Sequence, residues 1–194
     1  MSTQDIYVAK NYSFELHPAM LKKIGEACDV EQAVARFAEQ TKGKSPAEIE
    51  NEGRAFFTAY GRDWITLAHK LGDEYPDRTY EVLLEIVDKS KGYYKFALLP
   101  QRFLEIAYLA TMDMSVLPIV ENNAQRLIYR VVDCKTYKNL KEKCGDAVAE
   151  SLPCRYGCLT ACETIHQDLD VDAAIHQAAS MPKEGYCEFW AQRA

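Results

Sequence analysis

The hydrophobic pattern changes its period after Met112, and this change constrains the fold more than any other feature of the chain. Between residues 18 and 110, apolar residues recur every three or four positions, as on the buried side of an α-helix. Four later segments instead have the alternation and composition of β-strands, namely 115–120, 126–132, 173–180 and 186–192. The sequence therefore predicts an α+β fold, with a mainly helical portion over residues 1–112 and an α+β portion over residues 113–194.

Start signals indicate where the predicted helices begin. Ser45, Pro46 and Glu48 have the spacing of a capping box with proline in the first turn, which predicts a helix over 46–71 that ends at Gly72. Gly53 and Gly61 inside this helix predict a close approach by another element. The other predicted helices cover 19–28, 30–40, 77–89, 100–110, 136–144, 146–152 and 154–168.

The strands are expected to form a small antiparallel sheet made of two hairpins, with helices between them. No composition change marks a linker, so we expect a single domain over residues 1–194. The helices at 46–71 and 77–99 should then pack on the sheet and close a pocket. The strand at 126–132 is apolar on both faces, which predicts a central position, whereas Pro118 fits an edge or a bulge.

Charge and hydropathy narrow the classes of partner. The chain has 194 residues and a net charge of −6, which disfavours nucleic acid and anionic membrane surfaces. No apolar run reaches the ~20 residues of a membrane span, and the first residues lack the pattern of a secretion signal. We therefore expect a cytoplasmic protein with reduced thiols and a small-molecule ligand, and the sequence leaves a homodimer open.

Cysteines are concentrated near the end of the chain. The segment 154–187 contains four of the seven cysteines. Cys154, Cys158, Cys162 and His166 follow at intervals of four, which places them on one slowly drifting stripe of a helix. Three explanations stay open: a buried apolar face, a site for a soft or borderline metal, or a nucleophilic thiol.

Several of these features resemble the L-2-amino-thiazoline-4-carboxylic acid hydrolase-like family, which is similar in turn to the 4-vinyl reductase-type small-molecule-binding domain. They are the order hairpin, helices, hairpin over 113–194, a strand that ends at Cys134, a cysteine on the penultimate helix, and a last strand that opens with Cys187-Glu188-Phe189. The resemblance implies hydrolysis of a small heterocyclic or sulfur-containing molecule. Its alternative implication is a non-enzymatic sensor or carrier in which a metal site organises a hydrophobic pocket.

The resemblance also implies roles for particular residues. Cys154, Cys158, Cys187 and His176 are the candidate ligands of zinc or another transition metal, although the second cysteine pair expected in the last hairpin is replaced by His176 alone. In the hydrolase interpretation, Cys154 or Cys158 is the nucleophile and His166 or His176 carries the proton. Cys187 is then a second thiol that lines the site.

Two further expectations follow from residue type and position. Cys154 follows Pro153 in the expected first turn of its helix, where backbone N–H groups favour an anion, so it should react fastest with alkylating agents. Tyr93, Tyr108 and Trp64 are candidate substrate-binding residues, because aromatic side chains with polar tips often line ligand pockets. For Trp64, a place in the hydrophobic core is the alternative.

Overall fold

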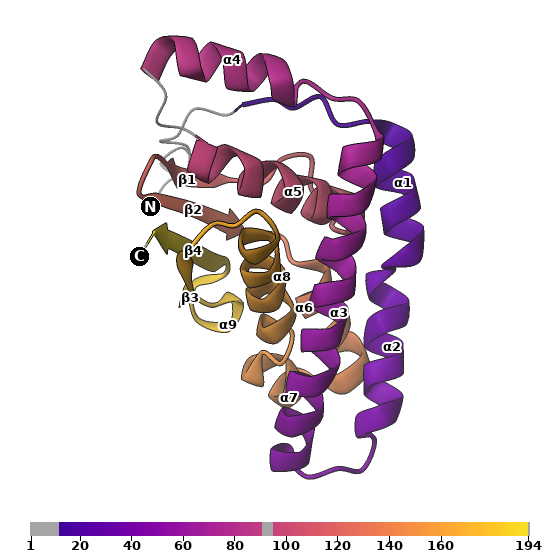
Figure 1. Ribbon diagram of the computed structural model, residues 1–194. Helices are drawn as coiled ribbons and strands as arrows, with labels where there is room; N and C mark the ends of the chain where they lie inside the picture. Colours follow the sequence, from indigo (N-terminus) through magenta and orange to yellow (C-terminus); the bar gives the residue numbers. More distant parts are fainter. Residues whose placement is uncertain (1–11, 91–94, 194) are drawn as a thin grey trace.

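The computed structural model describes residues 12–90 and 95–193, and it confirms the mixed helical and antiparallel-sheet architecture (Figure 1). The helices are α1 (Pro18–Ala27), α2 (Val30–Thr41), α3 (Pro46–Glu74), α4 (Thr79–Ser90), α5 (Lys95–Thr111), α6 (Lys135–Cys144), α7 (Asp146–Ser151), α8 (Arg155–Asp168) and α9 (Met181–Glu184). The strands are β1 (Ile119–Asn122), β2 (Arg126–Val131), β3 (Ala173–Ala179) and β4 (Cys187–Arg193). None of the described helices is both long and apolar enough to cross a membrane.

The four strands form one antiparallel sheet in the order β1-β2-β4-β3. The two hairpins predicted from the sequence are β1–β2 and β3–β4, and they join through the pairing of β2 with β4. The predicted central position of β2 is confirmed, and so is the predicted edge position near Pro118. The Pro118 carbonyl accepts a hydrogen bond from the N–H of Arg130, beside a break in the β1 register. Alternate residues of β4 therefore point to opposite faces, with Cys187, Phe189 and Ala191 on the buried one.

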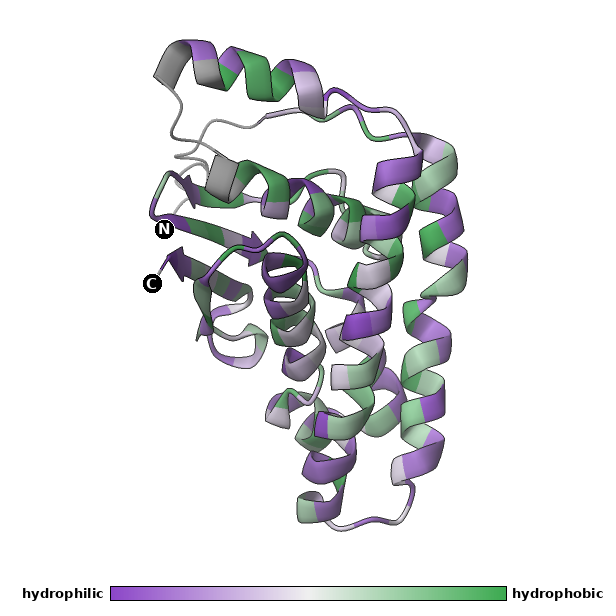
Figure 2. Ribbon diagram, viewed as in Figure 1, coloured by the Kyte–Doolittle hydropathy of each residue, from purple (hydrophilic) through white to green (hydrophobic). Residues whose placement is uncertain are grey.

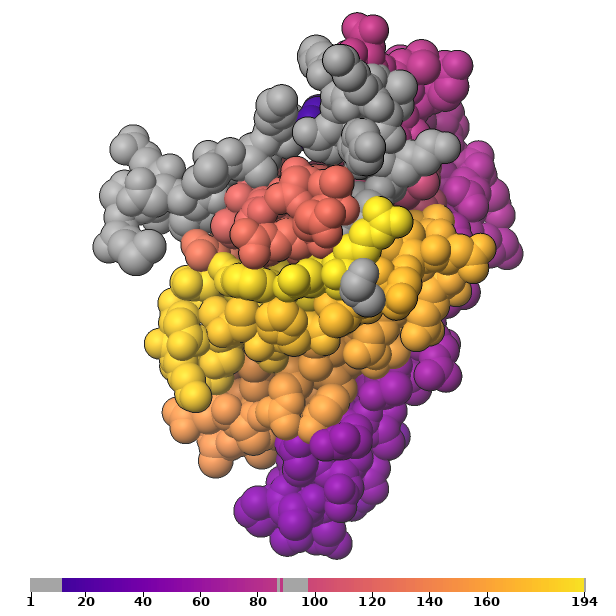
Figure 3. Space-filling model, turned by 60° about the vertical axis from the view of Figure 1, so that its left-hand side comes forward, coloured from indigo at the N-terminus to yellow at the C-terminus, as the bar shows by residue number. Residues whose placement is uncertain are grey.

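Helices cover one face of the sheet in successive layers. Helices α5 and α8 contact β2 and β3, α3 packs across both of these helices, and α1 and α2 lie outside α3 (Figure 1). Figure 2 shows hydrophobic residues along much of α5, in agreement with its place in the interior. On the other side of the sheet, residues of β3 and β4 form an open surface (Figure 3).

The longest helix meets α8 at a contact made by glycines. A Cβ added to Gly61 would lie 2.2 Å from the carbonyl oxygen of Gly157, and one added to Gly53 would lie 2.6 Å from the Cβ of Pro153. Both distances are far below normal van der Waals contact, so only glycine lets the two helices lie this close. The close approach predicted from these two glycines is therefore confirmed: α8 approaches Gly61, and Pro153 in the turn before α8 approaches Gly53.

The structure corrects three expectations about the helices. Helix α3 continues past Gly72 to Glu74, because Gly72 is buried against Phe103 and does not cap the helix. Helix α5 runs through Pro100 from Lys95, since tertiary packing maintains the helix despite one missing N–H group. Helix α3 packs on α8 and α5 in place of the sheet, and the described part of α4 contacts α5.

Replacing Gly61 by alanine tests this contact. Alanine normally favours a helix interior over glycine by about 1 kcal/mol, but here its methyl group would push α3 and α8 apart. We expect Gly61→Ala to lower the free energy of unfolding by about 1–3 kcal/mol, the usual cost of overpacking, as measured by denaturant titration. Gly157→Ala is the matched comparison, and its loss should be smaller, because its Cβ meets the Phe57 carbonyl oxygen at 3.2 Å. A Gly61→Ala protein as stable as the wild type would contradict this account.

Candidate functional site

Four cysteine thiols gather beneath the helical layer, and they come from three separate stretches of the chain. Cys134 follows β2 and caps α6, where its sulfur accepts a hydrogen bond from the N–H of Tyr137 at 3.4 Å. Cys154 is the residue before α8, Cys158 lies one turn into that helix, and Cys187 opens β4. We call these four residues the thiol cluster.

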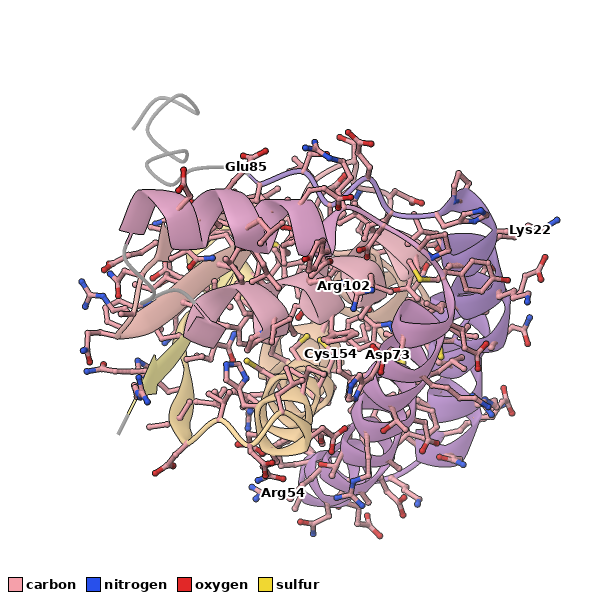
Figure 4. All side chains as sticks on the ribbon, turned by 45° about the horizontal axis from the view of Figure 1, so that its top comes forward. Lys22, Arg54, Asp73, Glu85, Arg102 and Cys154 are labelled. Carbon is pink, nitrogen blue, oxygen red and sulfur yellow. The ribbon has the colours of Figure 1, made fainter. Side chains whose placement is uncertain are left out.

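Local structure explains why these stretches meet. Val131 pairs with Cys187 across β2 and β4, so the chain leaving β2 passes beside the start of β4. Leu152 adopts a left-handed conformation with φ 54°, which turns the chain between α7 and α8 and directs Cys154 inward. Figure 4 shows Cys154 in the interior, whereas the labelled Lys22, Arg54 and Glu85 lie at the periphery.

The thiols of this cluster are buried and electrostatically coupled. Cys134, Cys154 and Cys187 are 7%, 6% and 7% exposed, and all three contribute to the main hydrophobic core. Burial raises the pKa of all four thiols, to about 12 for Cys187. The negative charge of the neighbouring thiolates raises the pKa of Cys154, Cys158 and Cys187 further. At neutral pH the cluster is therefore a set of neutral thiols.

Burial works against the expected activation of Cys154. The backbone N–H groups at the start of α8 were expected to lower the pKa of this thiol, but burial raises it well above the ordinary value. Desolvation dominates because the sulfur lies in the hydrophobic core and its side chain makes no capping hydrogen bond to the helix.

Two buried tyrosines adjoin the stripe of cysteines on α8. The rings of Tyr108 on α5 and Tyr129 on β2 meet edge to face at 5.8 Å, and both residues are fully buried. The Tyr108 hydroxyl lies close to Cys158, and the Tyr129 hydroxyl lies close to Cys162. Burial raises the pKa of both hydroxyls, and the charges of Cys158 and Cys162 add to the effect. Of the three candidate substrate-binding residues, Tyr108 therefore lies beside the thiols.

Trp64, another candidate substrate-binding residue, lies in the hydrophobic core. Trp64 is 2% exposed, and its indole N–H donates to the carbonyl oxygen of Ala107 at 3.1 Å. Its ring also packs edge to face on Tyr108 at 4.9 Å. These contacts favour the core alternative for Trp64. Tyr93 lies outside the described residues.

The two candidate histidines lie in different environments. His166 is buried on α8, where its Nδ1 atom is 2.7 Å from the carbonyl oxygen of Cys162, and burial lowers the pKa of its ring. His176 is exposed on the outer face of the sheet, beside Trp190 with 5.3 Å between the ring centroids. The strand register thus places His176 and Cys187 on opposite faces, so the four predicted metal ligands do not converge.

Cys134 takes the place in the cluster that the sequence had suggested for His176. The sequence pattern places Cys134 at the end of a strand and assigns it no ligand role. The one sequence feature that could have indicated a role for Cys134 is its position just after a strand that precedes the cysteine-rich segment. The pairing of that strand with β4 could not be predicted from the sequence, because the 55 residues from 132 to 186 separate the end of β2 from the start of β4.

The cluster in this form is not a completed metal centre. Within residues 12–90 and 95–193, no three His, Cys, Asp or Glu side chains are grouped so that they could hold a metal ion. The donor chemistry nevertheless suits a soft or borderline ion, because all four groups are thiols.

No protein-family model, curated protein or solved structure matches this chain.

Thiol reactivity tests the burial and the pKa directions together. Cys144 at the end of α6 is half-buried, whereas Cys154 and Cys162 are buried, and burial raises the pKa of Cys162 to about 12. We expect Cys144 to react with iodoacetamide well before Cys154 and Cys162, because only accessible thiolate reacts. Mass spectrometry of peptides from the folded protein measures the order, with urea-unfolded protein as the control for intrinsic reactivity. Alkylation of Cys154 as fast as that of Cys144 would contradict the structure.

Proposed function

We propose that the thiol cluster is a site for a soft or borderline metal ion such as zinc, in a non-enzymatic small-molecule sensor or carrier. The observation that supports it is the gathering of Cys134, Cys154 and Cys187 in the core, with the half-buried Cys158 packed beside them. Burial raises the pKa of Cys154, Cys158 and Cys187, and repulsion between neighbouring thiolates raises it further. A bound cation would offset that repulsion and would satisfy all four sulfur atoms at once.

The burial of the cluster also bears on the choice between sensor and hydrolase. A nucleophilic thiol needs a lowered pKa to be reactive near neutral pH, but burial raises the pKa of both Cys154 and Cys158. Neutral buried thiols are compatible with metal binding, because the ion displaces the protons as it binds. Hydrolysis of a small heterocyclic molecule stays a prediction from the resemblance, and it has less support from this site than metal binding.

In this proposal the cysteines that hold the ion come from different layers of the fold. Cys154 and Cys158 belong to α8, which α3 holds against the rest of the molecule, and Cys187 belongs to the sheet. An ion held by these residues and Cys134 would therefore link the helical layer to the sheet. Since the thiols are not yet grouped as a metal centre, their side chains have to close on the ion.

Metal content of substituted proteins tests the proposal. We expect the wild-type chain to retain zinc after dialysis, and Cys134→Ser and Cys187→Ser each to lose most of it, as measured by plasma mass spectrometry. Cys144→Ser is the matched control, because Cys144 lies outside the cluster. His176→Asn should retain zinc, because His176 lies on the outer face of the sheet. Circular dichroism of each variant checks that it is folded.

The pH dependence gives a second measure of the same site. Protons compete with the metal for the thiolates, and burial raises the pKa of each thiol, so zinc affinity should fall as the pH is lowered.

Failure of the wild-type chain to bind zinc, or equal retention of zinc by Cys134→Ser and Cys144→Ser, would overturn the proposal.

A further inference from the structure

A second place in the molecule combines a cavity with a buried carboxyl group, beside residues of α5 other than Tyr108. The cavity has a volume of about 300 Å³ and lies between the extended segment 12–16, α1, α5 and the residues before β1. Its apolar lining includes Phe14, Leu21 and Leu109. This volume is at the lower end of the range typical of small-molecule sites.

Glu105 is the polar group that sets this cavity apart. It lies on α5, it lines the cavity, and it is only 8% exposed. One of its carboxyl oxygens accepts a hydrogen bond from the side-chain amide of Gln101 at 2.6 Å, and Gln101 in turn accepts one from Asn122. Across the described part of the chain, no lysine, arginine or histidine forms an ion pair with Glu105.

Glu105 has no cationic partner among the described residues, so its ionised form is energetically unfavourable in this buried position. A buried carboxylate is costly unless a positive charge or several hydrogen bonds accompany it. Burial raises the pKa of Glu105 to about 8, and the single hydrogen bond from Gln101 offsets only part of that effect. The nearby Arg102 does not help, because its guanidinium group binds Asp77 at 2.7 Å and the carbonyl oxygen of Gly72.

The opposite wall of the cavity is held in an uncommon backbone conformation. Glu15 has φ 50°, which non-glycine residues seldom adopt. Contacts on both sides fix it there: the Phe14 carbonyl accepts a hydrogen bond from the N–H of Arg78 at 2.8 Å, and the Glu15 carboxylate pairs with the Arg78 side chain at 3.2 Å. Phe14 itself is 1% exposed. The cavity wall is therefore anchored by packing and hydrogen bonds.

We propose that this cavity binds a small organic ammonium ion with an apolar body, and that Glu105 is its counterion. The ammonium group would supply the positive charge that Glu105 does not obtain from its described neighbours. The apolar body would fill the space between Phe14, Leu21 and Leu109. The net charge of −6 favours the approach of a cation over that of an anion.

The site is distinct from the thiol cluster. On α5, Tyr108 adjoins the cysteines of α8, whereas Glu105 and Leu109 face the cavity. The other titratable groups that line the cavity are Tyr12 and Glu15, and Glu15 pairs with Arg78. The ammonium proposal therefore does not depend on whether the cysteines bind a metal.

Binding of 2-phenylethylamine to the full chain tests the proposal by isothermal titration calorimetry, with 2-phenylethanol as the neutral isostere. Above pH 8, where the Glu105 carboxylate predominates, we expect the amine to bind the wild-type protein at least about tenfold more tightly than the alcohol, because only the amine forms a charge-assisted hydrogen bond with Glu105. Below the pKa of Glu105, near 8, the carboxylate fraction grows about tenfold per pH unit. Amine affinity should therefore rise about tenfold from pH 6 to pH 7 and level off above pH 8.

Two substitutions complete the test. Glu105→Gln keeps the shape of the side chain and removes its charge, so it should weaken amine binding at least about tenfold and abolish the rise with pH. Val116→Trp is the second variant, because Val116 is 37% exposed at the cavity and can be enlarged without overpacking the core. It should block the amine in a protein whose thermal unfolding is unchanged.

Each outcome decides the proposal. Weaker binding of the alcohol, dependence on pH, and loss of binding in both variants would support an ammonium site at Glu105. No binding of the amine to the wild-type protein would overturn it. Equal binding of amine and alcohol, or an amine affinity unchanged by Glu105→Gln, would also overturn it, because the charge of Glu105 would then contribute nothing.

Discussion

The close contact of α3 with α8 is the constraint on which the rest of the structure depends. Gly61 and Gly157 let the two backbones meet where any side chain would hold them apart. This contact fixes α8 between α3 and the sheet. The same helix carries Cys154 and Cys158, so the position of the thiol cluster follows from a helix contact made by residues without side chains.

The layered arrangement gives α5 two different tasks. One side of the helix is turned toward α8, where Tyr108 adjoins the cysteine stripe, and another side is turned toward the cavity at Glu105. Both sites hold titratable groups whose pKa is raised chiefly by burial. In each site a cation would relieve the cost of a negative charge: a soft metal among the thiols, and an organic ammonium ion at Glu105. The common physical cause is a polar group placed inside an apolar layer.

Much of the architecture could be predicted from local patterns. The change of period after Met112 separates helices from strands, and the capping residues at Ser45 and Pro46 mark where α3 begins. Errors arose where tertiary packing outweighed a local signal. Gly72 has the features of a helix end, but in the fold it provides space beside Phe103, and α5 continues through Pro100 because its neighbours hold it in place.

For the candidate site, the sequence by itself determined the residue types and their helical stripe, from Cys154 to His166. Only the tertiary structure decided which residues meet. Pairing of β2 with β4 brings Cys134 to Cys187, while the alternation of β3 sends His176 to the opposite face. Spacing along the chain reports neighbours within one element, whereas these contacts join elements far apart in sequence. Burial is likewise a property of the packed fold, and for that reason the direction of the Cys154 pKa shift could not be read from its helix position.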